Sequence, residues 1–129
     1  MDGGKKKVVA VLSDLMFTAR IQEAARRTGL EAVFVSTQRD ALAQASRHPA
    51  LMILDLNYAG GDPLGTIAAV KGNQETKELT LLGFVSHVQT ELIQAAREKG
   101  CDVVMARSAF SQNLLSILGR YVAAETSAE

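Results

Sequence analysis

Short apolar runs alternate with longer segments of mixed polarity along almost the whole chain. The short runs are rich in aliphatic and β-branched residues and are bounded by turn residues, which is typical of buried strands. The longer segments place their apolar residues at helical spacing, which predicts amphipathic helices. The expected strands are residues 8–12, 32–36, 51–56, 81–85 and 103–105. The expected helices are residues 16–28, about 38–48, 63–71, 90–99 and 111–123.

Cap and turn residues mark several of the expected helix ends. Gly29 follows the first helix, where a residue that accepts a positive φ is favoured. Thr37 precedes the second helix and Asp40 stands three residues on, so we expect Thr37 to be the N-cap. Asp62 and Pro63 open the third helix as N-cap and first helical residue.

The order of elements is therefore strand then helix, five times. Strands that alternate with helices of this length predict a parallel sheet covered by helices on both faces. The fold class that we expect is α/β, a doubly wound five-stranded parallel sheet of (βα)5 type. A helical bundle would not explain the β-branched runs. We expect a basic leader at residues 1–7, one domain at 8–123 and a frayed polar tail at 124–129.

Composition narrows the class of protein without naming a function. The 129 residues are 47% hydrophobic and 22% charged, which suits one globular domain. The chain has 14 Lys and Arg residues in total and 14 Asp and Glu residues in total, and this balance of charge argues against a nucleic-acid partner. No apolar run approaches the roughly 20 residues that span a membrane, so we expect no membrane partner. The single cysteine, Cys101, suits a reducing compartment, and we expect a cytoplasmic protein.

Polar side chains follow four of the expected strands, at the point where each strand ends. An open parallel sheet binds its ligands beyond the carboxyl ends of its strands. We therefore expect these side chains to gather on one edge of the sheet. They are Ser13 and Asp14 after the first strand, Asp55 and Asn57 after the third, Ser86 and His87 after the fourth, and Arg107 after the fifth.

The chemistry that suits this set is transfer of a phosphoryl group to a carboxylate. Asp55 would be the nucleophile and would form an aspartyl phosphate. Mg²⁺ would relieve the repulsion between the two carboxylates, with Asp14, Asp55 and the backbone carbonyl of Asn57 as its oxygen ligands. Ser86 would hydrogen-bond to a phosphate oxygen, and the fork of Arg107 would pair with the phosphate.

Structural roles are open for the same residues. Asp14 could cap the first helix and Ser86 the fourth, because both residue types favour the N-cap position. Asp55 could be a simple loop cap. Arg107 could be an ion-pair partner of Asp55 before any phosphate arrives.

The pattern resembles the receiver domain of response regulators, the phosphoryl-accepting module of two-component signalling, which has a flavodoxin-like fold. The segments that carry the resemblance are VVAVLSD ending at Asp14, LMILDLN with Asp55, LGFVSH with Ser86 and GCDVVMARSAF with Arg107. The resemblance spans roughly residues 8–121. It implies that Asp14 binds Mg²⁺, that Asp55 is phosphorylated, and that Ser86 contacts the phosphate and couples it to a switch.

Four positions depart from the pattern of that family. Ser13 stands where the family has the first of two adjacent acids, which should weaken Mg²⁺ binding. Arg107 replaces a lysine, and its planar guanidinium is not equivalent to a compact ammonium. Ser108 replaces the proline that follows this lysine, and Val104 replaces an aromatic residue of the last strand.

The resemblance implies a stand-alone receiver that takes phosphate from a histidine kinase or a phosphotransfer protein. We expect output through contact with a downstream protein, on the face formed by the fourth helix, fifth strand and fifth helix, and no enzymatic activity beyond self-phosphorylation and dephosphorylation. The alternative is a pseudo-receiver, a phosphorylation-independent module that binds a protein or a ligand. A third class is a flavodoxin-like enzyme that binds a nucleotide or flavin, but the loop after the first strand lacks the glycines of a phosphate cradle.

Overall fold

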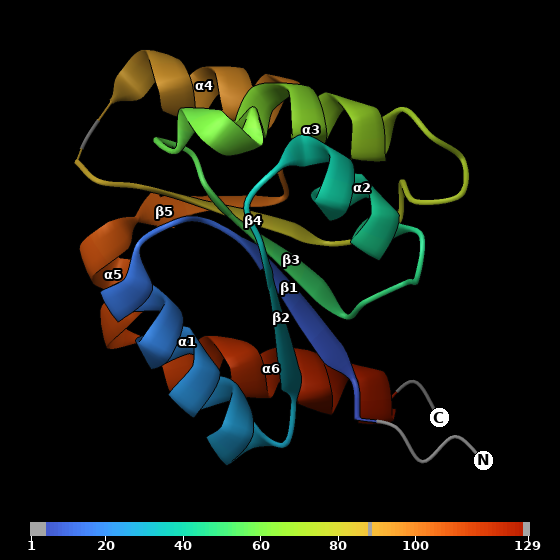
Figure 1. Cartoon of the computed structure of the whole chain (residues 1–129), viewed down its shortest axis with the longest axis vertical. Coiled ribbons are helices and arrows are strands. Elements are labelled where there is room, and N and C mark those ends of the chain that lie inside the picture. Colours follow the sequence, from blue (N-terminus) through green and yellow to red (C-terminus); the bar gives the residue numbers. More distant parts are fainter. Residues whose placement is uncertain (1–4, 88, 128–129) are drawn as a thin grey trace.

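Five parallel strands form one twisted sheet at the centre of the computed structural model, which describes residues 5–87 and 89–127 (Figure 1). The order of the strands across the sheet is β2-β1-β3-β4-β5, and every neighbouring pair is parallel. The order reverses at β1, so β1 and β3 flank the point where ligands bind in such sheets. The strands are β1 (Lys7–Val11), β2 (Glu31–Val35), β3 (Leu51–Asp55), β4 (Leu81–Val85) and β5 (Val103–Ala106).

Helices cover both faces of the sheet, which confirms the doubly wound α/β fold. One face carries α2 (Gln38–Ala45), α3 (Pro63–Lys71) and α4 (Thr90–Glu98), with a short 3-10 helix, η1 (Ala59–Gly61), before α3 (Figure 1). The other face carries α1 (Leu15–Thr28), α5 (Arg107–Gln112) and α6 (Leu114–Ser127) (Figure 1).

The central strands are buried on both sides and divide the core in two. Along β3, Leu51 and Ile53 pack toward α1 and α6, whereas Met52 and Leu54 pack toward the helices of the opposite face. Successive side chains of a strand point to opposite faces, so a strand that is apolar at every position can fill both halves of the core. The rigid β3 strand ends at Asp55.

The caps expected from the sequence are present. The side chain of Thr37 accepts the backbone N–H of Asp40 at the start of α2, over 3.1 Å. Asp62 caps α3 by accepting the N–H of Gly65, and Pro63 is the first helical residue. Gly29 ends α1 with φ 83°, in the left-handed region that favours glycine.

The C-terminal helical segment differs from the single helix predicted at residues 111–123. Helix α5 begins directly at Arg107, and Asn113 separates it from α6. No side chain caps the start of α5, so the sequence contains no cap signal there. Helix α6 continues through Ser127, so the described part of the expected polar tail is helical.

Several other boundaries differ from the prediction by one residue or more, among them those of α2 and β1. Helix α2 ends at Ala45 rather than near His48, whose own φ is 58°. Lys7 belongs to β1 and not to the expected leader, whose first four residues lie outside the described ones.

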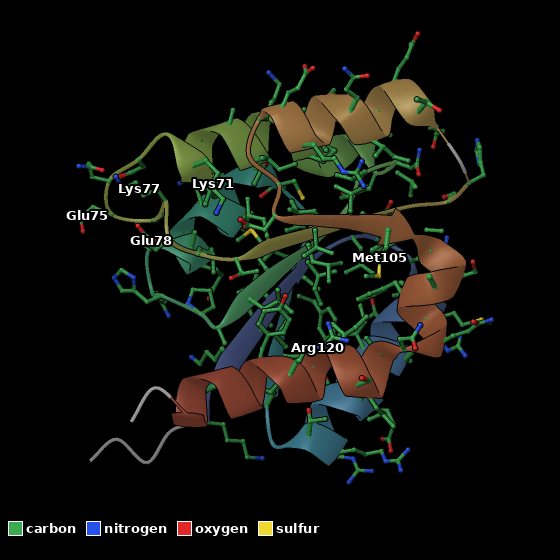
Figure 2. The ribbon with its side chains drawn as sticks, turned by 180° about the vertical axis from the view of Figure 1, so that it is seen from behind. Lys71, Glu75, Lys77, Glu78, Met105 and Arg120 are labelled. Carbon is green, nitrogen blue, oxygen red and sulfur yellow. The ribbon has the colours of Figure 1, made fainter. Side chains whose placement is uncertain are left out.

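Lys71 links several segments at the end of the sheet opposite the carboxyl ends of the strands. Its ammonium donates to the carbonyls of Lys77 and Leu79 and pairs with the carboxylate of Asp102 over 2.9 Å. Asp102 in turn accepts the N–H of Leu81, the first residue of β4. Figure 2 shows Lys71 beside the loop that carries Glu75, Lys77 and Glu78. These contacts have a structural role, which leaves the opposite end of the sheet as the place for function.

Within the part of the chain that the structure describes, no helix has the length and apolar character needed to cross a membrane.

Candidate functional site

The polar residues expected at one edge of the sheet do follow the carboxyl ends of their strands. Asp14 stands between β1 and α1, Asp55 is the last residue of β3, Ser86 follows β4, and Arg107 follows β5. Asp14 and Arg107 both influence the pKa of Asp55 through their charges. The two carboxylates and the guanidinium therefore form one electrostatic cluster.

The carboxyl group of Asp55 is half-buried and has one described hydrogen bond. Its Oδ1 accepts the backbone N–H of Asn57 over 2.9 Å, the one hydrogen bond described for this side chain. Burial raises the pKa of Asp55 above the ordinary value, and the charge of Asp14 adds to the rise. The Asn57 N–H and the charge of Arg107 oppose the rise but do not cancel it. The result is a carboxylate that is more basic than a solvated one, and a more basic oxygen is a better nucleophile.

Asp14 has two structural partners. Its Oδ1 accepts the N–H of Phe17 over 3.0 Å and so caps α1. Its Oδ2 pairs with a terminal nitrogen of Arg107. The Phe17 N–H and then the Arg107 hydrogen bond lower the pKa of Asp14, so this group is ionised when Asp55 begins to titrate. The N-cap interpretation of Asp14 is thus confirmed, which does not exclude a role as a metal ligand.

Arg107 does not form the ion pair with Asp55 that the sequence left open as an alternative. It reaches from the start of α5 to Asp14, and its guanidinium carbon lies 4.7 Å from the centre of the Phe17 ring. A guanidinium over an aromatic face gains cation–π attraction. The contact with the face of the Phe17 ring and the ion pair with Asp14 hold this side chain in place, whereas an exposed arginine is usually mobile.

Phe17 is a site residue that the sequence reasoning did not single out. Its ring packs at steep angles against Phe84 and Phe110, with centroids 5.1 and 5.6 Å away, and the latter two rings stack at 5.2 Å. The buried positions of α1 follow helical spacing through Phe17 and Ile21, so its burial was predictable. Its contact with Arg107 was not, because the two residues come from distant segments.

Asn57 joins two loops of the site through its side chain. Its Oδ1 accepts the backbone N–H of Ser86 over 2.8 Å, and its Nδ2 donates to Oε1 of Gln89 over 2.6 Å. The sequence predicted a role only for its backbone carbonyl, and Gln89 carried no signal. The β3–α3 connection that follows Asp55 is therefore tied to the β4–α4 connection that carries Ser86.

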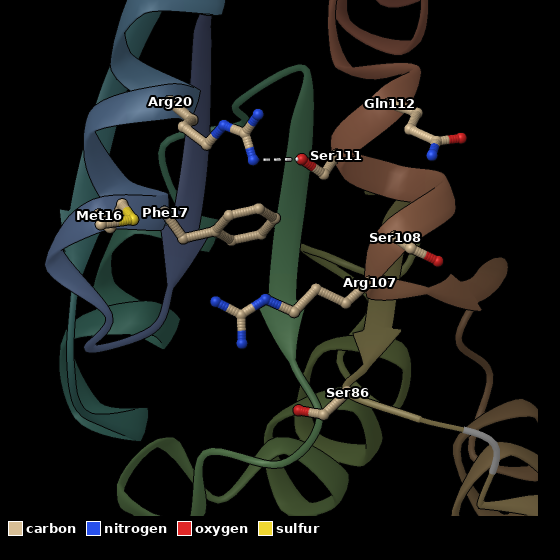
Figure 3. Close-up of a pocket in the computed structure, with 8 residues that line it drawn as sticks. All are labelled: Met16, Phe17, Arg20, Ser86, Arg107, Ser108, Ser111 and Gln112. Atoms are coloured by element: carbon tan, nitrogen blue, oxygen red, sulfur yellow. Dashed lines mark hydrogen bonds between the residues drawn. The ribbon is translucent and has the colours of Figure 1, made fainter.

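An open cleft of about 510 Å³ lies beside this cluster, between α1 and α5 (Figure 3). Ser86 and Arg107 line its inner end, next to the carboxyl ends of the strands. Figure 3 shows the Arg107 side chain extending toward α1, with Ser86 below it in this view. The geometry gives an incoming anionic group access to a hydroxyl and a guanidinium from the same side.

The donor set near Asp55 suits a hard cation only in part. Mg²⁺ prefers carboxylate and carbonyl oxygens, which Asp14, Asp55 and Asn57 can supply. Both oxygens of Asp14 are already engaged, by Phe17 N–H and by Arg107. Among the described residues, no three or more His, Cys, Asp or Glu side chains are grouped so that they could hold a metal. A cation would have to displace Arg107 from Asp14, so the oxygen chemistry fits and the competition predicts weak binding.

No protein-family model and no curated protein sequence matches the chain. Solved structures do match. A response regulator from Hahella chejuensis is 18% identical with a TM-score of 0.81, covering 90% of this chain and 94% of that one. The phosphorylated cyanobacterial phytochrome response regulator RcpA is 22% identical with a TM-score of 0.74, covering 90% of each chain.

A third match is the receiver domain of the sensor histidine kinase PA1611 from Pseudomonas aeruginosa, with a magnesium ion coordinated in its active-site cleft. It is 13% identical with a TM-score of 0.78, covering 93% of this chain and 99% of that one. Each of these likenesses covers 90% or more of this chain. The chain therefore has the fold of a response regulator receiver domain.

Proposed function

We propose that this chain is a phosphoryl-accepting receiver of a two-component signalling system, with Asp55 as the phosphoacceptor. The observation that supports this most directly is the state of Asp55. It is a half-buried carboxyl with a raised pKa and one described hydrogen bond, at the end of the central strand β3. A purely structural aspartate would be expected to have its oxygens engaged, as those of Asp14 are.

The reaction is a transfer from a histidine kinase or a phosphotransfer protein. An oxygen of the Asp55 carboxylate attacks phosphorus, a P–O bond forms, and the P–N bond of the donor phosphohistidine breaks. The leaving imidazole takes up a proton from solvent. Arg107 and the Ser86 hydroxyl stand where they can contact the oxygens of the transferred group, since both line the cleft beside the cluster.

Mg²⁺ is the cofactor that the donor set favours, with Asp14, Asp55 and the Asn57 carbonyl as its ligands. When bound it would neutralise charge between the carboxylates and the phosphoryl oxygens. A magnesium ion is coordinated in the active-site cleft of the PA1611 receiver domain. In this chain Asp14 must first release Arg107, and that release would free the guanidinium to pair with the phosphate on Asp55.

Output through a downstream protein follows from where the charge is added. Arg107 begins α5 directly after β5, so a change of its partner acts on the start of that helix. Ser86 stands at the start of the β4–α4 connection, held by Asn57. Phosphorylation would therefore bias the face formed by α4, β5 and α5, where we place the contact with the downstream protein.

The test is phosphorylation by acetyl phosphate with Mg²⁺, followed by intact mass. The wild-type protein should gain one phosphoryl group, and Asp55→Asn should gain none. Asp62→Asn is the matched control, because it changes a nearby exposed aspartate in the same way while asparagine still caps α3. Equal labelling of wild type and Asp55→Asn would reject Asp55 as the acceptor.

A phosphorylation-independent binding module is the second candidate. The Asp14–Arg107 ion pair favours it, because Arg107, the cation expected to pair with the phosphate, already has Asp14 as its partner in this structure. Ser13 also leaves the cluster one acid short of the receiver pattern. Under this alternative, Asp55→Asn would leave signalling intact, whereas loss of phosphorylation would end signalling under the first proposal.

A further inference from the structure

The cleft between α1 and α5, which we name the α1–α5 cleft, has an unusual distribution of charge. Arg20 and Arg107 line it, together with Met16, Phe17, Ser111 and other polar residues of α5. No aspartate or glutamate is among the described residues that form its lining. Arg107 is paired with Asp14, which lies outside the lining, whereas Arg20 has no carboxylate partner among the described ion pairs, so the lining favours anions.

The two arginines enter from opposite walls. Arg20, on α1, donates to the hydroxyl of Ser111 on α5 over 2.7 Å (Figure 3). Arg107, at the start of α5, extends in the other direction toward Asp14 on the α1 side (Figure 3). A guanidinium has five N–H donors, and each of these two uses only one in the hydrogen bonds described. Both can therefore hold a ligand anion without losing their present contacts.

An apolar side chain, the 3% exposed Phe17, lies between the two charges. Figure 3 shows the Phe17 ring between the side chains of Arg20 and Arg107. Met16 adds a thioether to the rim and is 77% exposed, although large apolar side chains are usually covered. Along the cleft, the apolar side chain of Phe17 therefore lies between the cations Arg20 and Arg107.

We infer that the α1–α5 cleft binds a small organic dianion with a short apolar middle, of the dicarboxylate class. One carboxylate would pair with Arg20 and accept a hydrogen bond from the Ser111 hydroxyl. The other would pair with the outer N–H groups of Arg107, and the methylene groups between them would lie against Met16 and the exposed edge of Phe17. Binding of this kind needs no phosphorylation of Asp55 and no metal.

The experiment is titration of the purified protein with succinate, followed by amide chemical shifts. Saturable shifts should appear at Arg20, Ser111 and Arg107. Propionate has the same apolar part and one charge, so its affinity should be lower by about tenfold, as expected for loss of one charge-assisted contact. Inorganic phosphate supplies charge without an apolar middle and should also bind more weakly than succinate.

Arg20→Gln should weaken succinate binding by about tenfold, because it removes one of the two guanidinium groups. Arg27→Gln is the matched control, since Arg27 lies on the same helix with the same charge but does not line the α1–α5 cleft. The succinate titration contains neither a phosphodonor nor Mg²⁺, so a failed phosphotransfer assay leaves this test unaffected. The inference is overturned if succinate gives no saturable shift, or if propionate or phosphate binds as tightly as succinate. It is also overturned if Arg20→Gln and Arg27→Gln lose the same amount of affinity for succinate.

Discussion

The guanidinium of Arg107 donates to the carboxylate of Asp14 across 93 positions of sequence, and the same carboxylate caps helix α1. One carboxylate thus links the start of α1 to the start of α5. Arg107, the positive charge of the site, pairs with Asp14 and not with Asp55, and the pKa of Asp55 stays raised. Because Arg107 pairs with Asp14, it forms no ion pair with Asp55, which is compatible with the proposed role of Asp55 as phosphoacceptor.

Replacing Arg107 with glutamine should tighten Mg²⁺ binding. The substitution removes the cation that competes for Asp14 and leaves the three proposed oxygen donors in place. Loss of one charge-assisted hydrogen bond corresponds to a gain of about tenfold in Mg²⁺ affinity. Amide shifts of Asn57 and Asp55 during a Mg²⁺ titration measure it. Arg20→Gln is the control, since Arg20 does not contact Asp14, and an unchanged Mg²⁺ affinity in Arg107→Gln would count against the competition.

Substitutions of Asp14 should separate its two roles. Asp14→Asn keeps an oxygen that can accept the Phe17 N–H and loses the charge that pairs with Arg107. Asp14→Ala loses both the cap and the ion pair, and alanine is a poor N-cap. Urea unfolding should therefore rank the proteins as wild type, Asp14→Asn and Asp14→Ala in falling stability. Equal stability of the two variants would mean that the cap contributes nothing.

The sheet and most helices could be predicted because their signals are local. The bounds predicted for β4 and α3 agree with the structure, since an apolar run and an Asp-Pro cap define them. The start of α5 could not be found, because Arg107 begins a helix with no capping side chain.

The site was predictable as a set of residues but not as a set of contacts. Strand order placed Asp14, Asp55, Ser86 and Arg107 at one edge of the sheet, since each follows a parallel strand. Which carboxylate receives Arg107 depends on the reach of a long side chain and on the Phe17 ring beneath it. No periodicity or spacing encodes that choice.

Asp55→Asn should stabilise the fold at neutral pH and less so in acid. A folded-state pKa raised above the ordinary value of 3.8 means that folding favours the protonated carboxyl. In the wild type, the protonated Asp55 side chain stabilises the folded state at pH values below the ordinary pKa. This stabilisation is lost as the pH rises through the raised pKa of the folded state. Asparagine is neutral throughout and retains an acceptor for the Asn57 N–H. Urea unfolding at pH 7 and at pH 3 should show the difference in free energy of unfolding between variant and wild type shrinking at pH 3.

Phe17→Leu should destabilise the fold by about 1–2 kcal/mol, because a buried ring is lost along with two edge-on ring contacts. The same substitution removes the aromatic face beneath Arg107, so the side-chain signals of Arg107 should broaden or shift. Phe34→Leu is the control. Phe34 is only partly buried against the same half of the core, so its replacement should cost less and leave Arg107 unchanged.

Removing the side chain of Asn57 should free the loop that carries Ser86. In Asn57→Ala the Ser86 N–H loses its 2.8 Å acceptor, and Gln89 loses its 2.6 Å donor. A hydrogen bond of this kind contributes about 1 kcal/mol, so the Ser86 amide should exchange with solvent about fivefold faster. Amide exchange followed by NMR measures this directly.

Gln89→Ala is the control that separates the two contacts, because it deletes the Gln89 acceptor and leaves the bond from Ser86 to Asn57 in place. Its Ser86 amide should exchange at close to the wild-type rate. If both variants accelerate exchange equally, the loop is held by the Asn57–Gln89 contact, and the Ser86 bond merely follows it. If neither does, Asn57 does not restrain Ser86, and the proposed path from Asp55 to the β4–α4 connection loses its physical link.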